Sequence, residues 1–200
     1  MNVRTRFSPS PSGSLHLGNI RTALYCWLYA SKNNGDFILR IEDTDIDRTC
    51  DIYVQNIFDT LNWLGLHWTE GPYYQMKRLN LYNIMLNKLL VEKKAYRCYC
   101  TKERLSELRF MQIKNKKKPK YDSFCRDLNY IKDISYVVRF KNPKNGVVYF
   151  SDGIYGDITV DNNELDDLVI IRSDGVPTYN FVAVVDDIDM KITDVIRGAD

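Results

Sequence analysis

The first 42 residues alternate between apolar strand patterns and a helical repeat. Residues 3–8 predict a buried strand, which two prolines and a glycine end. Apolar residues then recur at helical spacing over 17–28, ahead of Gly35, and Phe37 to Glu42 alternate as a second strand. The pattern predicts a βαβ unit with a proline- and glycine-rich turn at the carboxyl end of the first strand. Open α/β sheets bind their ligands at such turns.

Two more helical repeats follow, and then the pattern changes. Apolar spacing predicts one helix over about 50–64 and another that begins at about Leu79. After residue 97 we expect a charged helix and two short strands, Tyr136 to Phe140 and Val147 to Phe150. Asn145-Gly146 predicts a hairpin turn between these two strands.

The last 35 residues are expected to return to the first sheet. Leu168 to Arg172 predicts a strand that resumes it, followed by a turn, a short helix from Pro177 and a final strand over Ile192 to Arg197. The fold class is therefore α/β, a Rossmann-type parallel sheet with an inserted α+β subdomain. Residues 1–96 would form the first half of this domain, 97–165 the insertion and 166–200 the start of the second half.

Composition and charge narrow the class of protein. The 200 residues are 44% hydrophobic, and no apolar run is long enough for a membrane span or a secretory signal. Five cysteines, an odd number, favour a reduced, cytoplasmic setting. The net charge of +2 leaves nucleic acid binding open. The basic run from Lys114 to Lys120 is either a solvated linker or a contact with an RNA phosphate backbone.

The loop between the first strand and the first helix carries candidate phosphate chemistry. A helix N-terminus offers free N–H groups and a partial positive charge, which suit a phosphate. His16, at the helix start, can donate to a phosphate oxygen, and Gly18 permits close approach of the backbone or an adenine ring. Taken alone, the segment also fits an ordinary helix start. The loop is neither a G-x-G-x-x-G fingerprint nor a P-loop.

In context, this loop resembles the HIGH motif of class I aminoacyl-tRNA synthetases, in the form found in bacterial glutamyl enzymes. The matching residues are Pro9, Ser10, Pro11, Ser12, Gly13, Ser14, Leu15, His16, Leu17, Gly18 and Asn19. Asn19 stands where the motif ends in histidine, a departure that those enzymes often share. The resemblance implies ATP binding by Ser10, His16, Gly18 and Asn19, with catalytic roles for His16 and Gly18.

Further segments resemble the glutamyl enzymes: Arg40-Ile41-Glu42-Asp43-Thr44-Asp45 after the second strand, and, near the end, Tyr179-Asn180-Phe181, Val184-Val185-Asp186-Asp187 and Thr193-Asp194-Val195-Ile196-Arg197-Gly198-Ala199-Asp200. Without the family, the acidic cluster reads as solvated or as a Mg²⁺ site, and Arg197 as a surface arginine. The resemblance implies a set of glutamate-binding residues: Arg6, Ser8, Ser10, Glu42, Tyr179 and Arg197. It also places three residues near the terminal adenosine of tRNA: Thr44, Asp45 and Arg48.

The predicted insertion contains a set of cysteines with ligand-like spacing. Cys98, Cys100 and Cys125 could hold tetrahedral Zn²⁺ with one further ligand. The family resemblance puts Asp127 in the fourth position, and Tyr121 is the rival because a short paralogue uses a tyrosine there. A degenerate site without metal is the alternative.

The resemblance implies an activity: ATP-dependent ligation of L-glutamate to tRNA(Glu) through glutamyl adenylate, with Mg²⁺-ATP as substrate. It implies a cytoplasmic monomer without membrane contact. In the family a KMSKS-type loop and an anticodon-binding domain follow the segment that ends at Asp200, so we expect the 200 residues alone to be inactive. Two alternatives are a glutamyl-queuosine tRNA(Asp) synthetase and a non-catalytic tRNA-binding paralogue.

Overall fold

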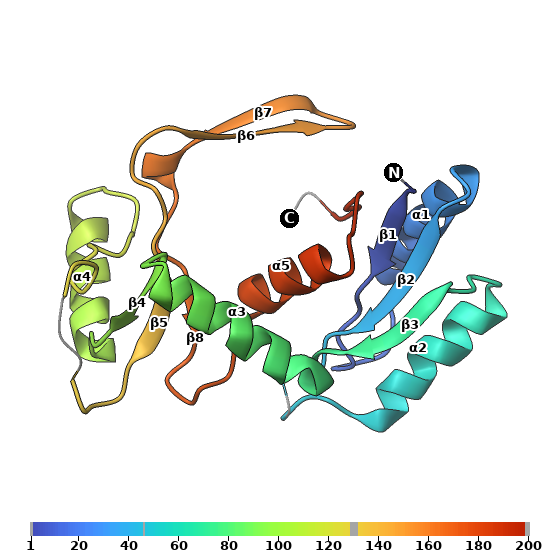
Figure 1. The fold of residues 1–200 in the computed structure, drawn as a ribbon, viewed down its shortest axis with the longest axis horizontal. Helices are drawn as coiled ribbons and strands as arrows, with labels where there is room; N and C mark the ends of the chain where they lie inside the picture. The colour runs from blue at the N-terminus through green and yellow to red at the C-terminus, as the bar shows by residue number, and fades with distance from the viewer. Residues whose placement is uncertain (1, 46, 129–131, 199–200) are drawn as a thin grey trace. The chain divides into compact units, whose positions relative to one another are not determined.

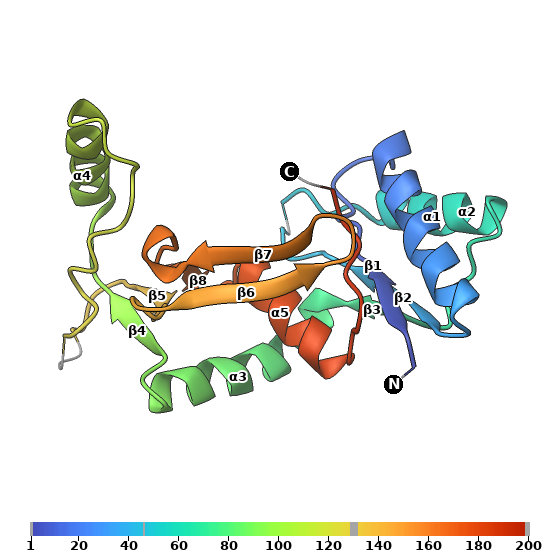
Figure 2. The same cartoon turned by 90° about the horizontal axis from the view of Figure 1, so that it is seen from above.

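The structure, a computed structural model, describes residues 2–45, 47–128 and 132–198, and it divides into two compact units. The first unit joins Met1–Asn83 to Tyr179–Asp200, and the second is Ile84–Thr178 (Figures 1 and 2). The first contains β1 (Arg4–Phe7), α1 (Leu17–Lys32), β2 (Asp36–Ile41), α2 (Asp51–Trp63), β3 (Glu70–Tyr74), η1 (Gln75–Arg78), the start of α3 (Leu79–Val91) and α5 (Tyr179–Asp189). The second contains β4 (Ala95–Cys98), α4 (Lys102–Lys114), β5 (Val137–Phe140), β6 (Val147–Asp152), β7 (Gly156–Asp161), η2 (Asn162–Glu164) and β8 (Val169–Ile171).

The first unit is built on a parallel sheet in the order β1-β2-β3, which confirms the Rossmann-type prediction. One face of β2 packs with α1 and α2 in a single apolar core that includes Phe37, Leu39 and Ile41. On the other face, the side chain of Arg40 reaches α5. The expected alternation along β2 was wrong, because both faces of the strand are covered and every residue from Phe37 to Ile41 is buried.

Strand β3 was not predicted from the sequence. It contains Gly71 and Pro72, which in most contexts indicate a turn. A side chain at Gly71 would meet the Leu39 carbonyl oxygen at 2.3 Å, so the strand needs glycine where it approaches β2. Close packing of two backbones therefore explains a residue that reads as a strand breaker.

In the second unit, two strand pairings differ from those predicted from the sequence. β5 pairs antiparallel with β4 and β8, whereas β6 pairs antiparallel with β7. The predicted hairpin across Asn145-Gly146 was therefore wrong, because its two strands belong to different sheets. The prediction that Leu168 to Arg172 resumes the parallel sheet was also wrong, since β8 lies beside β5. The second unit consequently begins before residue 97 and ends after residue 165.

The predicted strand over Ile192 to Arg197 is not formed. Thr193 donates its N–H to the Arg4 carbonyl at 3.0 Å, so the segment does lie beside β1. The Arg4 N–H, however, donates to the Thr193 hydroxyl at 2.7 Å instead of to a backbone carbonyl. The hydroxyl of Thr193 thus accepts from the backbone N–H of Arg4 that a β-ladder would need. Ala199 and Asp200, which complete the predicted Arg-Gly-Ala-Asp motif, lie outside the described residues.

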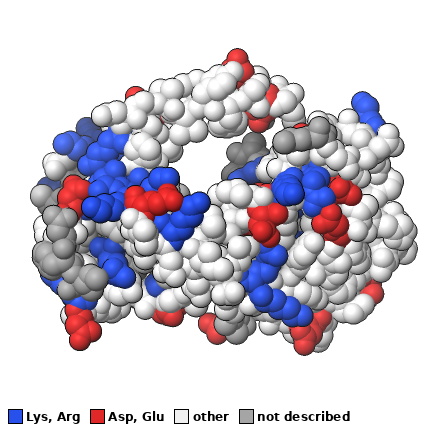
Figure 3. Space-filling view, in the orientation of Figure 1, with Lys and Arg blue, Asp and Glu red and all other residues white. Residues whose placement is uncertain are grey.

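The surface of the second unit is charged in one part and apolar in another. The β6–β7 hairpin, at the top of Figure 3, shows mainly uncharged atoms and exposes Val147, Tyr149 and Ile154. The lysines from Lys114 to Lys118 are exposed after α4, and an RNA-contacting role for them stays a prediction. None of the described helices has the length and apolar character that crossing a bilayer requires.

Candidate functional site

A cavity of about 670 Å³ opens in the first unit at the carboxyl end of β1. Its wall comes from the end of β1, the loop that follows, the start of α1, the start of α5 and the segment after Ile196. Eight of the residues predicted to bind ATP or glutamate line it: Arg6, Ser8, Ser10, His16, Gly18, Asn19, Tyr179 and Arg197. Residues almost 200 positions apart therefore meet in one place. The roles assigned to them stay predictions.

His16 caps helix α1 with its own ring. Its Nδ1 accepts hydrogen bonds from the N–H groups of Gly18 at 3.0 Å and Asn19 at 3.3 Å. The Asn19 side-chain oxygen in turn accepts from the His16 N–H at 3.1 Å, which completes a capping box. An Nδ1 that accepts leaves the ring proton on Nε2 in the neutral tautomer. The cap thus leaves His16 with an Nε2–H donor at the cavity wall.

Gly18 has a local reason to lack a side chain. A Cβ at this position would lie 2.8 Å from Cε1 of the His16 ring. The group that Gly18 admits in this structure is the imidazole that caps the helix. Glycine at this position is therefore needed for the placement of His16, and we still predict that it allows a ligand to approach.

Arginine side chains give the cavity its positive charge. Arg6 and Arg197 both line it, and Arg6 donates from Nε to both carboxylate oxygens of Asp187 at 3.2 Å. The buried hydroxyl of Ser8 has no hydrogen-bond partner among residues 2–45, 47–128 and 132–198. A buried hydroxyl normally has a partner, so Ser8 is suited to contact a ligand.

Glu42 is not among the residues that line the cavity, but it is hydrogen-bonded directly to Pro9, which is one of them. Its N–H donates to the carbonyl of Pro9, and its side chain, 8% exposed, pairs with Arg40 at 3.3 Å. Burial raises the pKa of Glu42 to about 6, although the charge of Arg40 and its hydrogen bond act in the opposite direction. Glu42 thus has the only carboxylate among the predicted glutamate ligands, and burial destabilises the charged form of that carboxylate.

Sequence reasoning missed a buried network of charges beside the cavity. Arg40, fully buried in β2, donates to Asp187 at 2.6 Å and has Asp186 at 3.7 Å. Asp186 is also fully buried and accepts hydrogen bonds from three side chains: Gln75, Arg78 and Tyr82. An arginine within an apolar strand, and two acids on the apolar side of a helix, are the signals that could have revealed it.

The predicted tRNA-contacting residues lie in the loop after β2. Arg48, which is largely exposed, donates from Nε to the carboxylate of the partly exposed Asp45 at 2.6 Å. The Asp45 carbonyl accepts a hydrogen bond from the Thr49 hydroxyl at 2.8 Å. Hydrogen bonds between its own residues therefore hold this part of the loop. Contacts of Thr44, Asp45 and Arg48 with RNA stay predictions.

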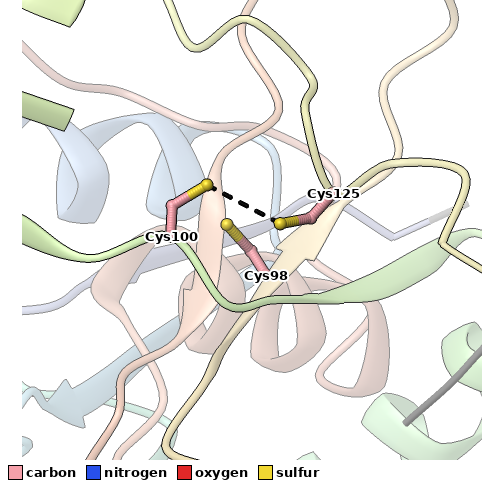
Figure 4. A group of neighbouring side chains, drawn as sticks. All are labelled: Cys98, Cys100 and Cys125. Atoms are coloured by element: carbon pink, nitrogen blue, oxygen red, sulfur yellow. Dashed lines mark hydrogen bonds between the residues drawn. The ribbon is translucent and has the colours of Figure 1, made fainter. Parts of the chain in front are cut away.

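The second unit brings three of the four predicted metal ligands together. The sulfur atoms of Cys98, Cys100 and Cys125 lie within 4.8 Å of one another. Figure 4 shows the three side chains gathered in one place. Cys100 and Cys125 have their sulfurs 3.6 Å apart. Tetrahedral Zn²⁺ with Zn–S bonds of about 2.3 Å requires a separation of about 3.8 Å. The three thiols therefore fit zinc.

The structure favours Tyr121 over Asp127 as the fourth ligand. The Tyr121 hydroxyl lies 3.2 Å from the sulfur of Cys98 and 3.6 Å from that of Cys100. An oxygen and a sulfur that share tetrahedral Zn²⁺ would be about 3.5 Å apart. Asp127 does not join the cluster, because its carboxylate, 83% exposed, pairs with Lys141 at 2.9 Å. The fourth ligand stays a prediction, and Tyr121 is the candidate that lies at the cluster.

The two remaining cysteines, Cys26 and Cys50, lie outside this cluster. Cys26 is fully buried in the core beneath α1, and burial raises the pKa of its thiol to about 11. Cys50 precedes the first residue of α2. A thiol that stays protonated in an apolar core is a packing residue.

Comparisons with known proteins show the family to which the chain belongs. Residues 2–200 match the family described as tRNA synthetases class I (E and Q), catalytic domain. The chain is 57% identical over 202 residues to a glutamate–tRNA ligase of Wigglesworthia glossinidia brevipalpis and 58% identical over 201 residues to one of Legionella pneumophila (strain Lens). All of the chain is covered in both comparisons, but it spans only 43% of the length of either relative.

A solved structure has the same fold. The glutamate tRNA ligase from Elizabethkingia meningosepticum CCUG26117, in complex with its amino acid, superimposes with a TM-score of 0.88 at 37% identity. The match covers 99% of this chain and 44% of that one. The family match over nearly every residue and the shared fold lead to one conclusion: this chain belongs to the class I tRNA synthetases of the E and Q type, within their catalytic domain.

Proposed function

We propose that this chain forms the amino-acid-activating part of a ligase that attaches L-glutamate to tRNA(Glu) at the expense of ATP. The observation that carries the proposal is that Arg6, Arg197 and the capping His16 line one cavity. Two arginines suit a ligand with a negatively charged side chain, because a buried carboxylate without a cation is costly. Glutamate meets that requirement and glutamine does not.

In the first step, an oxygen of the glutamate α-carboxylate attacks the α-phosphorus of Mg²⁺-ATP, and pyrophosphate leaves. The Nε2–H of His16 and the N–H groups at the start of α1 would stabilise the charge on the phosphate oxygens, with Ser10, Gly18 and Asn19 around the nucleotide. Arg6, Arg197 and Tyr179 would hold the glutamate side chain, and Glu42 its ammonium group. Positioning and charge stabilisation then suffice without a covalent enzyme nucleophile.

In the second step, the hydroxyl of the 3′-terminal ribose of tRNA attacks the acyl carbon of glutamyl adenylate, and AMP leaves. Thr44, Asp45 and Arg48 would contact the terminal adenosine in this step. The protein is proposed to act as a cytoplasmic monomer.

The complete gene product tests this function. We expect glutamate-dependent exchange of pyrophosphate into ATP in the presence of tRNA, and transfer of glutamate to tRNA(Glu). Glutamine should support neither reaction. Transfer to queuosine-bearing tRNA(Asp) in place of tRNA(Glu) would identify the short paralogue. Binding of tRNA without binding of glutamate or ATP would favour a non-catalytic RNA-binding protein.

The raised pKa of Glu42 predicts how glutamate binding depends on pH. Below about pH 6 the carboxyl becomes protonated and the substrate ammonium loses its partner, so affinity should fall up to about tenfold per pH unit. The side-chain carboxylate of free glutamate has a pKa of about 4.3 and stays charged in this range. Calorimetric titration of glutamate between pH 5 and 8 measures the effect.

Glu42→Gln is the matched control for this pH dependence. It should bind glutamate weakly and with no pH dependence between pH 5 and 7, because the titrating group is gone. A parent protein whose dissociation constant stays constant from pH 7 to pH 5 would rule out Glu42 as the ammonium ligand.

Zinc is a second element of the proposal. Cys98, Cys100, Cys125 and Tyr121 would hold one Zn²⁺, and the metal would fix the loop between β4 and α4 to the segment that carries Cys125. Structural zinc of this kind contributes directly to folding and plays no part in the reaction.

Metal analysis distinguishes the two fourth ligands. We expect about one zinc per chain in the parent and in Asp127→Asn, and loss of zinc in Cys125→Ser. Tyr121→Phe should weaken zinc binding without abolishing it, as measured by competition with a chelator. Loss of zinc from Asp127→Asn with retention in Tyr121→Phe would restore the assignment made from the sequence.

A further inference from the structure

We propose that Asp187 is the positioning residue of the glutamate site, which orients Arg6 directly and Glu42 through Arg40. The inference rests on the proposed function of the cavity. It assigns a role to a residue that does not line that cavity. Asp187 lies in the last turn of α5 and is partly buried, its side chain being 22% exposed.

Asp187 joins two arginines that come from neighbouring parallel strands. Its carboxylate accepts from Arg6 Nε, with both oxygens at 3.2 Å, and from Arg40 Nη1 at 2.6 Å. Arg6 belongs to β1 and Arg40 to β2. One carboxylate from α5 therefore fixes a side chain on each of the two strands that lead to the site.

Arg40 extends the connection to Glu42. Its Nη2 donates to the Glu42 carboxylate at 3.3 Å while its Nη1 is held by Asp187. Arg40 has no exposed surface, so water cannot replace either Asp187 or Glu42 as its hydrogen-bond partner. The order Arg6, Asp187, Arg40, Glu42 thus links the proposed ligand of the substrate carboxylate to the proposed ligand of the substrate ammonium.

The way in which Asp187 contacts Arg6 suits a ligand-binding arginine. Within the described part of the chain, the hydrogen bonds of the Arg6 side chain are made by Nε alone. The terminal Nη1 and Nη2 groups are the pair that can hold a carboxylate with two parallel hydrogen bonds. Asp187 therefore restrains the guanidinium and leaves that pair to the substrate.

The neighbouring Asp186 cannot take over this task. It already accepts from Gln75, Arg78 and Tyr82, and its closest approach to Arg40 is 3.7 Å, at Nε. Loss of the Asp187 charge would leave Arg40 with Glu42 as its nearest remaining carboxylate, at 3.3 Å, and Arg6 without a restraint. Both ends of the substrate site would change together.

Asp187→Asn in the complete gene product tests the proposal, because asparagine keeps the shape and removes the charge. We expect the KM for glutamate in pyrophosphate exchange to rise about 10- to 100-fold, while the KM for ATP changes less than about twofold. Asp189→Asn is the matched control, since Asp189 lies on the same helix and pairs with Arg78. It should change neither KM.

The outcomes separate this inference from the function on which it rests. A parent protein that does not bind glutamate contradicts the proposed function itself. An active parent with an unchanged KM for glutamate in Asp187→Asn overturns the role of Asp187. Equal rises in both KM values, or a loss only of the active fraction, would show a purely structural role and overturn it too. If Asp187→Asn does not fold, Asp187→Glu, which keeps the charge but displaces the carboxylate, replaces it with the same expected split.

Discussion

Replacement of His16 by alanine is expected to slow the activation of glutamate about 100- to 1000-fold, the usual effect of losing one donor to developing charge. His16 uses Nδ1 to accept from the N–H groups of Gly18 and Asn19, so its proton lies on Nε2. That N–H is the donor that the side chain can offer to a phosphate. Pyrophosphate exchange at saturating glutamate and ATP measures the loss.

A serine at the same position separates catalysis from capping. Serine is a good N-cap residue but has no group that reaches as far as Nε2. His16→Ser should therefore lose as much activity as His16→Ala, while only the alanine variant loses about 1 kcal/mol of stability through the cap. If His16→Ser exchanges pyrophosphate at the rate of the parent, His16 acts on the helix and not on the nucleotide.

The part of the fold that the sequence predicts well is the part with local signals. The strand, loop and helix before Gly35 follow from apolar spacing and from the prolines after Ser8, and the structure has them within a few residues of the expected bounds. The loop predicted to bind phosphate could be recognised for the same reason, because its residues are contiguous. The convergence of Arg6 with Arg197 required the family resemblance, since nothing local connects them.

Long-range pairing in the second unit was not predictable from local pattern. Asn145-Gly146 has the composition of a hairpin turn, but β6 finds its partner in β7 and not in β5. The partners of β5 are β4, which precedes α4 in the sequence, and β8. Register and partner depend on which faces are buried, and the short strands of this unit carry little of that information.

The predicted metal ligands were also only partly predictable from the sequence. Asp127 lies two positions after Cys125, where the family resemblance implies a ligand, yet its carboxylate pairs with Lys141. Tyr121 reaches the thiols because its hydroxyl accepts the Cys125 N–H at 2.9 Å while the sulfurs gather around it. Spacing can restrict the candidates, but the direction of each side chain decides between them.

Replacement of Asp186 by alanine is expected to lower the free energy of unfolding by about 3–5 kcal/mol, the cost of removing one partner from a buried ion pair. Asp186 has no exposed surface and lies between the charges of Arg78 at 2.8 Å and Arg40 at 3.7 Å. It also accepts from the Tyr82 hydroxyl at 2.9 Å. Without the carboxylate, the fully buried Arg40 and the buried Tyr82 hydroxyl lose a charged neighbour, and the partly exposed Arg78 keeps only Asp189. Chemical denaturation of the variant and the parent measures the difference.

Two comparisons show whether the buried charge causes this effect. Asp189→Ala removes a half-exposed carboxylate that pairs with the same Arg78, and it should cost about 1 kcal/mol or less. Tyr82→Phe removes one donor and leaves the carboxylate with its cations, so its cost should be about 1 kcal/mol. If Asp186→Ala costs no more than these two variants, the interior around Arg40 is hydrated in solution. In that case water would also reach the contacts between Asp187 and Arg40, and Asp187 would fix Glu42 less firmly.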